Sequence, residues 1–344
     1  MGDTVQRNNT IDEIKGIAIV LVFLGHAIQY YSGSAYLESG EYLNNILFKA
    51  IYSFHMPLFA LISGYLFSFS VKKRTVQETL RSRVKSLLFP IMAWSVVNFA
   101  VDIAQNGCPQ SLLGLVNHFF WTAMNTLWFL WAILICSLMV SVVHYVFHGN
   151  LVLYLLPCLL AFVTPDKFNL VYAKFLYPSF VVGFLWNGSK LRDRIFEVKR
   201  FRYKTLGALL IGVFIALLCL FNKDTYIYTS RVTLLGNQNI SYQIYQDILR
   251  WSIGLVGSVS LIFLWGGVKH SSLSRTFLSA MGRNSLGMYV LNVFLNSNIL
   301  YPMTCNWSTI YIGAFLTIPA IVFCYTIMMV LKKVPGSRWL LGGK

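Results

Sequence analysis

Apolar residues occupy ten segments that together fill most of the chain. Most of these segments approach the roughly 20 residues that an α-helix needs to span a bilayer. The fifth segment is shorter and contains Pro157. The pattern predicts an all-α polytopic membrane protein of about ten transmembrane helices, at about 11–31, 46–69, 87–105, 126–147, 151–164, 170–188, 205–221, 251–268, 282–300 and 309–332.

The composition agrees with this pattern. Of the 344 residues, 56% are hydrophobic and 12% are charged, whereas soluble domains have about 25% charged residues. The first apolar segment is not followed by a small-residue cleavage site, so it is interpreted as a helix and not as a signal peptide. We therefore predict one integral membrane domain over residues 1–344.

The net charge of +16 raises the question of a nucleic-acid partner. Most of the 28 basic residues fall in alternate loops if the N-terminus lies in the cytoplasm. Such a bias is the positive-inside pattern of membrane proteins. It predicts cytoplasmic termini and no nucleic-acid binding.

The first segment has charged residues at its N-terminal end and a histidine deep inside it. Thr10 and Glu13 form a capping-box pattern, and His26 follows Lys15 by eleven residues. That spacing is about three helical turns, so both side chains return to one face, close to Asp12. A histidine in hydrocarbon is costly and should face the bundle interior or a wet cavity. The alternative is a buried histidine satisfied by a backbone carbonyl.

A second histidine, His55, lies in the next apolar segment. Both His26 and His55 fall in the predicted outer half of the bilayer. Adjacent antiparallel helices would bring them together, so both are candidate catalytic residues. Pro57, two residues after His55, is read as an ordinary kink that neighbouring helices can accommodate.

A basic segment at 71–90 precedes the third span and is expected to form an amphipathic helix that lies along the membrane. One interpretation is a topology signal that contacts anionic lipid. The other is a seat for a phosphorylated cytosolic ligand, for which Arg83 and Lys85 are best placed. Ser285, Tyr289 and Asn292 recur at helical spacing in the ninth segment, where such groups either bind a ligand or join helices.

Aromatic and cysteine residues add weaker signals. Trp128 lies in an aromatic run typical of a membrane interface. The polar segment at 222–250 combines tyrosines and amides that suit either a sugar or interfacial anchoring. None of the six cysteines has metal-type spacing. Cys108 and Cys305 are expected in outer loops, where an oxidising compartment would permit a disulfide.

Several short motifs now point to one family. The chain resembles the membrane acyltransferase-3 family in D-x-x-K-G-I-A with a histidine eleven residues after the lysine, F-H-M-P-L-F followed by S-G-Y at Ser63–Tyr65, L-W-F-L at 127–130, Y-P-S-F-V-V-G-F at 177–184 and N-S-L-G-M-Y at 284–289. Two positions depart from the family pattern. Lys15 stands where arginine is frequent, which keeps the charge and loses the guanidinium fork. Asn292 stands where histidine is frequent, so it cannot carry a proton.

The resemblance implies an enzyme of the bacterial inner membrane. Such enzymes transfer an acyl group, commonly acetyl from acetyl-CoA, to a hydroxyl of an envelope glycan or a lipid-linked sugar. The implied partners are acyl-CoA as a co-substrate, a sugar or polysaccharide acceptor and the lipid bilayer, with no bound cofactor and no metal. The resemblance also implies that His26 is essential.

Two mechanisms remain open for His26. A neutral imidazole can act as the general base for the acceptor hydroxyl, or it can carry the acyl group itself. Lys15 is too far along the helix to touch His26 and is expected to hold the donor or the cytoplasmic gate. The residues expected to bind donor or acceptor are Asp12, Lys15, Ser63, Arg83, Lys85, Trp128, Ser285, Tyr289 and Asn292.

The rival class is a transporter or flippase for a glycan or small-molecule intermediate. Polar residues within spans and a basic inner face would suit that class too. Against it, Asp102 is the only carboxylate expected well inside a span, and no internal repeat is visible.

Overall fold

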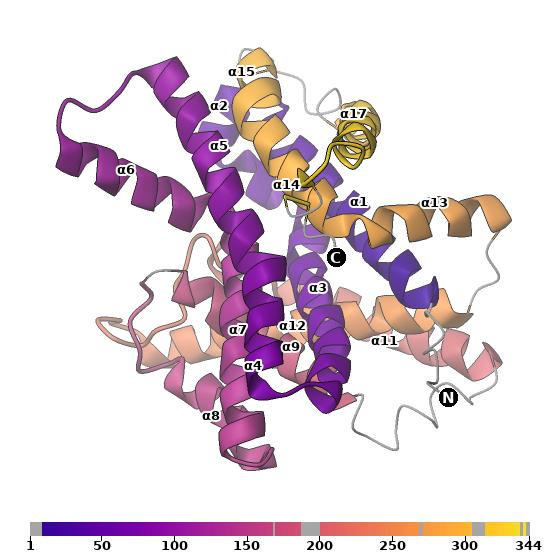
Figure 1. The fold of residues 1–344 in the computed structure, drawn as a ribbon. Helices are drawn as coiled ribbons and strands as arrows, with labels where there is room; N and C mark the ends of the chain where they lie inside the picture. The colour runs from indigo at the N-terminus through magenta and orange to yellow at the C-terminus, as the bar shows by residue number, and fades with distance from the viewer. Residues whose placement is uncertain are drawn as a thin grey trace, which may run out of the picture.

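The structure is a computed structural model that describes residues 9–167, 169–186, 200–267, 271–304, 314–337 and 340–341. All regular elements in these ranges are helical, which confirms the all-α fold (Figure 1). They are α1 (Asn9–Tyr30), α2 (Ser34–Ser39), η1 (Glu41–Asn44), α3 (Ile46–Lys73), α4 (Val76–Arg83), η2 (Val84–Leu88), α5 (Phe89–Asn106), α6 (Leu112–Asn125), α7 (Trp128–Val146), α8 (Leu151–Leu160), α9 (Leu170–Trp186), α11 (Arg200–Leu220), η3 (Lys223–Thr225), α12 (Ile240–Gly267), α13 (Ser272–Arg283), α14 (Ser285–Leu295), η4 (Asn296–Leu300), α15 (Tyr301–Thr304) and α17 (Thr317–Leu331).

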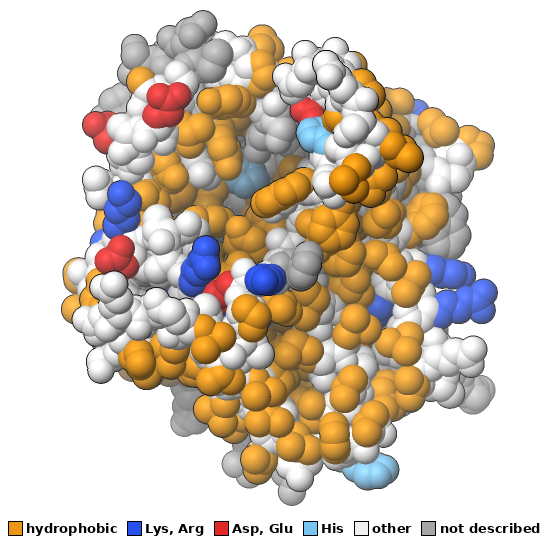
Figure 2. Space-filling view, turned by 90° about the vertical axis from the view of Figure 1, so that its left-hand side faces the viewer, with side chains coloured by type: hydrophobic (Ala, Val, Ile, Leu, Met, Phe, Trp, Pro, Cys, Tyr) orange, Lys and Arg blue, Asp and Glu red, His pale blue; other side chains and the backbone are white. Residues whose placement is uncertain are grey.

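A helix occupies at least part of each of the ten apolar segments. By length and composition, four described helices could cross a membrane: α3, the continuous helix Val76–Asn106, α7 and α12. Hydrophobic side chains also cover much of the outer surface on the side of the molecule seen in Figure 2. Ten crossings with cytoplasmic termini stay a prediction.

The basic segment before the third span is helical, but it continues directly into that span and does not form the separate helix along the membrane that the sequence suggested. Thr75 and Glu78 form a capping box at the start of α4: the Glu78 amide donates to Thr75 Oγ1 at 3.3 Å, and the Thr75 amide donates to Glu78 Oε2 at 2.9 Å. A π-helical turn, η2, then joins α4 to α5, so the two form one rod in Figure 1. The turn ends two residues before Pro90, which cannot donate a backbone hydrogen bond. Arg83 is thereby placed on a rigid element.

Glycines set how closely the central helices approach. A Cβ at Gly64 of α3 would lie 1.9 Å from the Phe180 carbonyl oxygen of α9, and a Cβ at Gly183 would lie 1.8 Å from the Leu61 oxygen. Both distances are far below van der Waals contact, so only glycine permits this crossing. The same device occurs where Gly16 of α1 packs on α13. Close helix packing thus explains why glycine stands at three positions of the family-like motifs, Gly16, Gly64 and Gly183.

The sequence did not predict α6 or α13, and it placed the start of α12 eleven residues too late. The added first turns of α12 carry a buried ion pair: Arg250 Nη1 lies 3.1 Å from Asp247 Oδ1, with side chains 1% and 0% exposed. Arg250 Nη2 also donates to the Asp224 carbonyl at 3.2 Å. This network holds the polar segment after α11 against the bundle. Asp102 is therefore not the only carboxylate within a membrane-length helix, which corrects the expectation from sequence.

Candidate active site

His26, near the end of α1, is held by side chains of α14 and η4. Its Nδ1 lies 2.6 Å from Asn292 Oδ1 and 2.7 Å from Asn296 Nδ2. The Tyr31 hydroxyl donates to Asn296 Oδ1, so four side chains form one network. His26 thus contacts side-chain amides and not a backbone carbonyl. The contact differs from the one expected if His26 were only a buried packing residue.

The network favours one tautomer of His26. A carbonyl oxygen accepts hydrogen bonds, so the contact with Asn292 requires a proton on Nδ1. With that proton in place, Asn296 Nδ2 donates to Asn292 Oδ1 at 3.2 Å, and its 2.7 Å approach to Nδ1 is a contact between two donors and not a hydrogen bond. We assign the proton to Nδ1 on this hydrogen-bonding argument. Nε2 then keeps the lone pair that a base or nucleophile requires.

His26 opens onto a cavity of about 680 Å³, called here the outer cavity. Its walls come from the ends of α1, α5, α6 and α14, from the start of α7, and from α2, α3, η4 and α15. Most of its lining is uncharged: Tyr30, Asn98, Gln105, Asn106, Thr122, Asn125, Thr126, Trp128, Asn296, Ser297, Asn298 and Tyr301. The acidic residue at its wall, Asp102, pairs with His118 of α6. Among the described lining residues there is no lysine or arginine.

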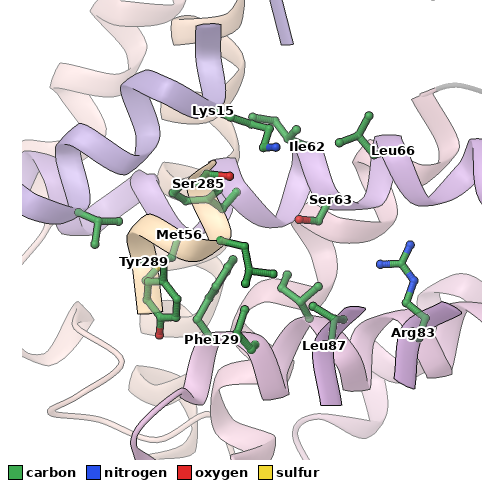
Figure 3. Close-up of a pocket in the computed structure, with 15 residues that line it drawn as sticks. Lys15, Met56, Ile62, Ser63, Leu66, Arg83, Leu87, Phe129, Ser285 and Tyr289 are labelled. Atoms are coloured by element: carbon green, nitrogen blue, oxygen red, sulfur yellow. The ribbon is translucent and has the colours of Figure 1, made fainter. Parts of the chain in front are cut away.

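A second cavity of about 190 Å³, the inner cavity, lies at the opposite ends of α1, α3 and α14. Lys15, Ser63, Arg83, Ser285 and Tyr289 line it together with apolar side chains (Figure 3). In that view Lys15 and Ser285 lie toward one end, Arg83 lies at the other, and Ser63 lies between them. Five of the residues expected to bind substrate are therefore brought to one cavity.

Arg83 is fixed in the inner cavity by an aromatic ring. Its guanidinium carbon lies 4.2 Å from the centroid of the Phe67 ring, which is a cation–π contact. Arg83 Nε is buried and makes no hydrogen bond within the described part of the chain. A cation with unused donors in a cavity is well suited to bind an anion.

Two side chains line both cavities. Met56 of α3 and Tyr289 of α14 belong to the outer and to the inner cavity. The first turn of α7 lies at the same junction, because Trp128 lines the outer cavity and Phe129 lines the inner one. The cationic cavity and the histidine cavity are thus separated by a thin partition.

His55 lies apart from this arrangement. It lines a small pocket of about 10 Å³ with Tyr52 and Arg250. Its Nδ1–H donates to the Ile51 carbonyl at 2.7 Å, and the residue is 1% exposed. His26 and His55 thus line different pockets, and Met56 lines both of these pockets. His55 therefore fits the alternative given from sequence for an intramembrane histidine, which is a buried residue hydrogen-bonded to a backbone carbonyl.

Of the other residues expected to bind substrate, Asp12, Lys85 and Asn292 line neither cavity, although Asn292 contacts His26. Asp12 is buried at the crossing of α1 and α13, where its carbonyl packs on Gly282. Lys85 is exposed and lines neither cavity, although it is only two residues from Arg83. Cys108 is exposed, and its proposed partner Cys305 falls outside the described residues. Within the described ranges no cluster of His, Cys, Asp or Glu could hold a metal ion.

Sequence reasoning missed Asn296, Tyr31 and the amides of α5. A signal was present for Asn296, because it follows Asn292 by four residues and so shares its helix face. Tyr31 and Asn98 offered no such signal, since Tyr31 directly follows α1 and Asn98 lies on α5, both distant in sequence from Asn296.

Comparisons with known proteins agree with this picture. A family model described as an acyltransferase domain matches residues 8–329. The nodulation protein NolL of Mesorhizobium japonicum is 26% identical over 303 residues, which cover 84% of this chain and 76% of the relative. NolL of Sinorhizobium fredii is 29% identical over 296 residues, covering 83% and 77%. No solved structure matches the chain. The chain belongs to the acyltransferase-3 family, a family of membrane-embedded acyltransferases, as its motifs predicted.

Proposed function

We propose that this acyltransferase moves an acyl group, most simply acetyl, from acyl-CoA on the cytoplasmic side to a hydroxyl of an envelope glycan or lipid-linked sugar. One observation carries the proposal: a cavity with two cations and a cavity with an oriented histidine share Met56 and Tyr289 as walls. Such an arrangement lets donor and acceptor enter from opposite sides and meet at the partition.

The inner cavity suits the donor. The phosphates of coenzyme A are too highly charged to enter hydrocarbon, so they stay near the cytoplasmic mouth. Arg83 binds phosphate through a planar fork and Lys15 acts as a point charge. The uncharged arm of coenzyme A then extends past apolar walls toward Met56, which brings the thioester to the partition.

The outer cavity suits a sugar. Its amide and hydroxyl groups match sugar hydroxyls, and Trp128 offers an aromatic face. That face is braced by Tyr172, whose ring centroid lies 4.3 Å from that of Trp128. Since no lysine or arginine is found among the described lining residues, the cavity favours an uncharged sugar over an acidic one.

The chemistry needs a base for the acceptor hydroxyl. In our proposal His26 Nε2 takes the hydroxyl proton while the oxygen attacks the thioester carbonyl. Asn292 Oδ1 holds Nδ1–H and stabilises the imidazolium that forms, the role that asparagine has in Cys-His-Asn enzymes. Transfer by way of acyl-His26 stays open as the covalent variant. We assign His55 a packing role.

The proposal includes the topology predicted from charge, with ten spans, cytoplasmic termini and the bacterial inner membrane as the site. The cavity walls support it. Lys15, Arg83 and Ser285 lie at helix ends that the charge pattern puts inside, whereas His26, Asp102 and Trp128 lie toward ends that it puts outside. No observation favours the transporter or flippase alternative in a chain of an acyltransferase family.

The experiment measures acetyl-CoA consumption by purified protein in liposomes, with an envelope-glycan extract from cells that lack the protein as the acceptor. We expect His26→Ala to abolish consumption and Asn292→Leu to lower kcat, because the imidazole then loses the group that fixes its tautomer and stabilises its charged form. Tyr177→Phe, on α9, is the matched control with unchanged activity. If the parent protein consumes no acyl-CoA of any chain length, or His26→Ala retains the parental rate, the proposal is wrong.

A further inference from the structure

The packing of the helices does not explain why the hydroxyl of Tyr289 is buried. The residue is 5% exposed, and its Oη makes no hydrogen bond within the described part of the chain. Buried polar groups are nearly always paired, so an unpaired one at a cavity wall points to a ligand or a reacting group. Tyr289 lies three residues before Asn292, on the same face of α14 as the side chain that holds His26.

Phe129 is the neighbour that places a backbone amide beside Tyr289, and both residues line the inner cavity. Phe129 is the second residue of α7, whose N-cap Leu127 makes no side-chain cap. Amides in the first turn of a helix lack an intrahelical acceptor, and the helix dipole favours negative charge there. The two rings pack with centroids 5.7 Å apart, which fixes Tyr289 against this helix end.

We propose that the Tyr289 hydroxyl and the Phe129 amide together stabilise the oxyanion formed during acyl transfer. This inference rests on the proposed function. That function assigns a base, His26, and the inference adds the donors that stabilise the oxyanion. Both donors lie at the partition where the thioester from the inner cavity meets the acceptor from the outer cavity. Preorganised donors aimed at a developing charge supply a large part of the rate enhancement in acyl transfer.

The step balances as follows. The acceptor hydroxyl loses its proton to His26 Nε2 and its oxygen bonds to the thioester carbon. The carbonyl electron pair moves to oxygen, where the Tyr289 hydroxyl and the Phe129 amide donate to it. Collapse of the adduct restores the carbonyl, breaks the carbon–sulfur bond and releases coenzyme A, whose sulfur takes the proton from His26. No further reactant is needed.

The test is Tyr289→Phe in the acetyl-CoA assay, which removes one oxygen and keeps the ring packing. We expect kcat to fall by about 100- to 1000-fold, the loss typical of one oxyanion donor, with the KM for acetyl-CoA nearly unchanged. Tyr177→Phe is a matched control, because Tyr177 also has a buried, unpaired hydroxyl but lines neither cavity. It should retain the parental kcat.

Replacing Tyr289 with fluorotyrosine tests the oxyanion role separately, because a purely structural hydroxyl would leave kcat unchanged. A more acidic phenol is a stronger donor, so kcat at neutral pH should rise above the parental value. If Tyr289→Phe keeps the parental kcat while His26→Ala is inactive, the oxyanion role is refuted and the proposed function stands. A rise in KM with kcat unchanged would refute it also, since the hydroxyl would then only bind the donor. If His26→Ala is itself active, the proposed function fails first.

Discussion

The sharpest contrast that the structure offers is between two cations of the basic segment. Arg83 lines the inner cavity, whereas Lys85, two residues later, is exposed and does not. From sequence the two were equivalent candidates for the donor phosphates. We now predict that Arg83→Ala raises the KM for acetyl-CoA and that Lys85→Ala does not.

The magnitude follows from the contact that is lost. A hydrogen bond to a charged group contributes about 1.5–3 kcal/mol. With tenfold in affinity for each 1.4 kcal/mol, KM should rise about 10- to 100-fold. The guanidinium binds substrate and transition state alike, so kcat should stay near the parental value. Arg83→Lys should give an intermediate KM, because it keeps the charge and loses the fork.

The assay is release of free thiol from acetyl-CoA at a saturating amount of acceptor extract, with the folded fraction measured separately. That control matters because Arg83 also packs on the Phe67 ring, so its loss can lower stability. Lys85→Ala removes the same charge from the same segment and is the matched control. The reasoning is refuted if Arg83→Ala leaves KM unchanged. It is refuted equally if both variants raise KM alike, because the segment would then act through its overall charge.

Three further predictions concern packing and topology. Gly64→Ala should destabilise the folded protein by about 1–3 kcal/mol, since its Cβ would meet a backbone oxygen at 1.9 Å. Gly212→Ala, with open space at its Cβ, should be neutral or stabilising in the same thermal unfolding measurement. His55→Leu should lower the yield of folded protein and not the activity per folded molecule, which purification followed by the acetyl-CoA assay decides. A reporter active only in the cytoplasm should work when fused at Lys344 and fail at Asn237. A working fusion at Asn237 would mean that the number of spans before it is wrong by an odd number.

The sequence by itself determined the helices and the family. Burial in hydrocarbon forces every backbone polar group into local hydrogen bonds, so a long apolar run reads directly as a helix. Periodicity likewise placed Lys15 and His26 on one face of α1, because the helical repeat is a local property. The motifs added the family membership that the comparisons confirm.

Boundaries were less well determined where a helix is polar at its end. α12 begins at Ile240, well before its apolar segment, because buried partners neutralise Arg250 and Asp247. α6 and α13 were missed because short amphipathic helices carry a weaker hydropathy signal. Local composition does not report such tertiary compensation.

Only the tertiary structure decided which side chains meet. Asn292 contacts His26 from 266 residues away, and His55, on the neighbouring helix, lines a different pocket. Arg83 lines a cavity and Lys85 does not, although both belong to one basic segment. The reason is that pairing depends on the rotation and separation of packed helices. Contacts such as that of Gly64 with α9 set these quantities, and no local periodicity encodes them.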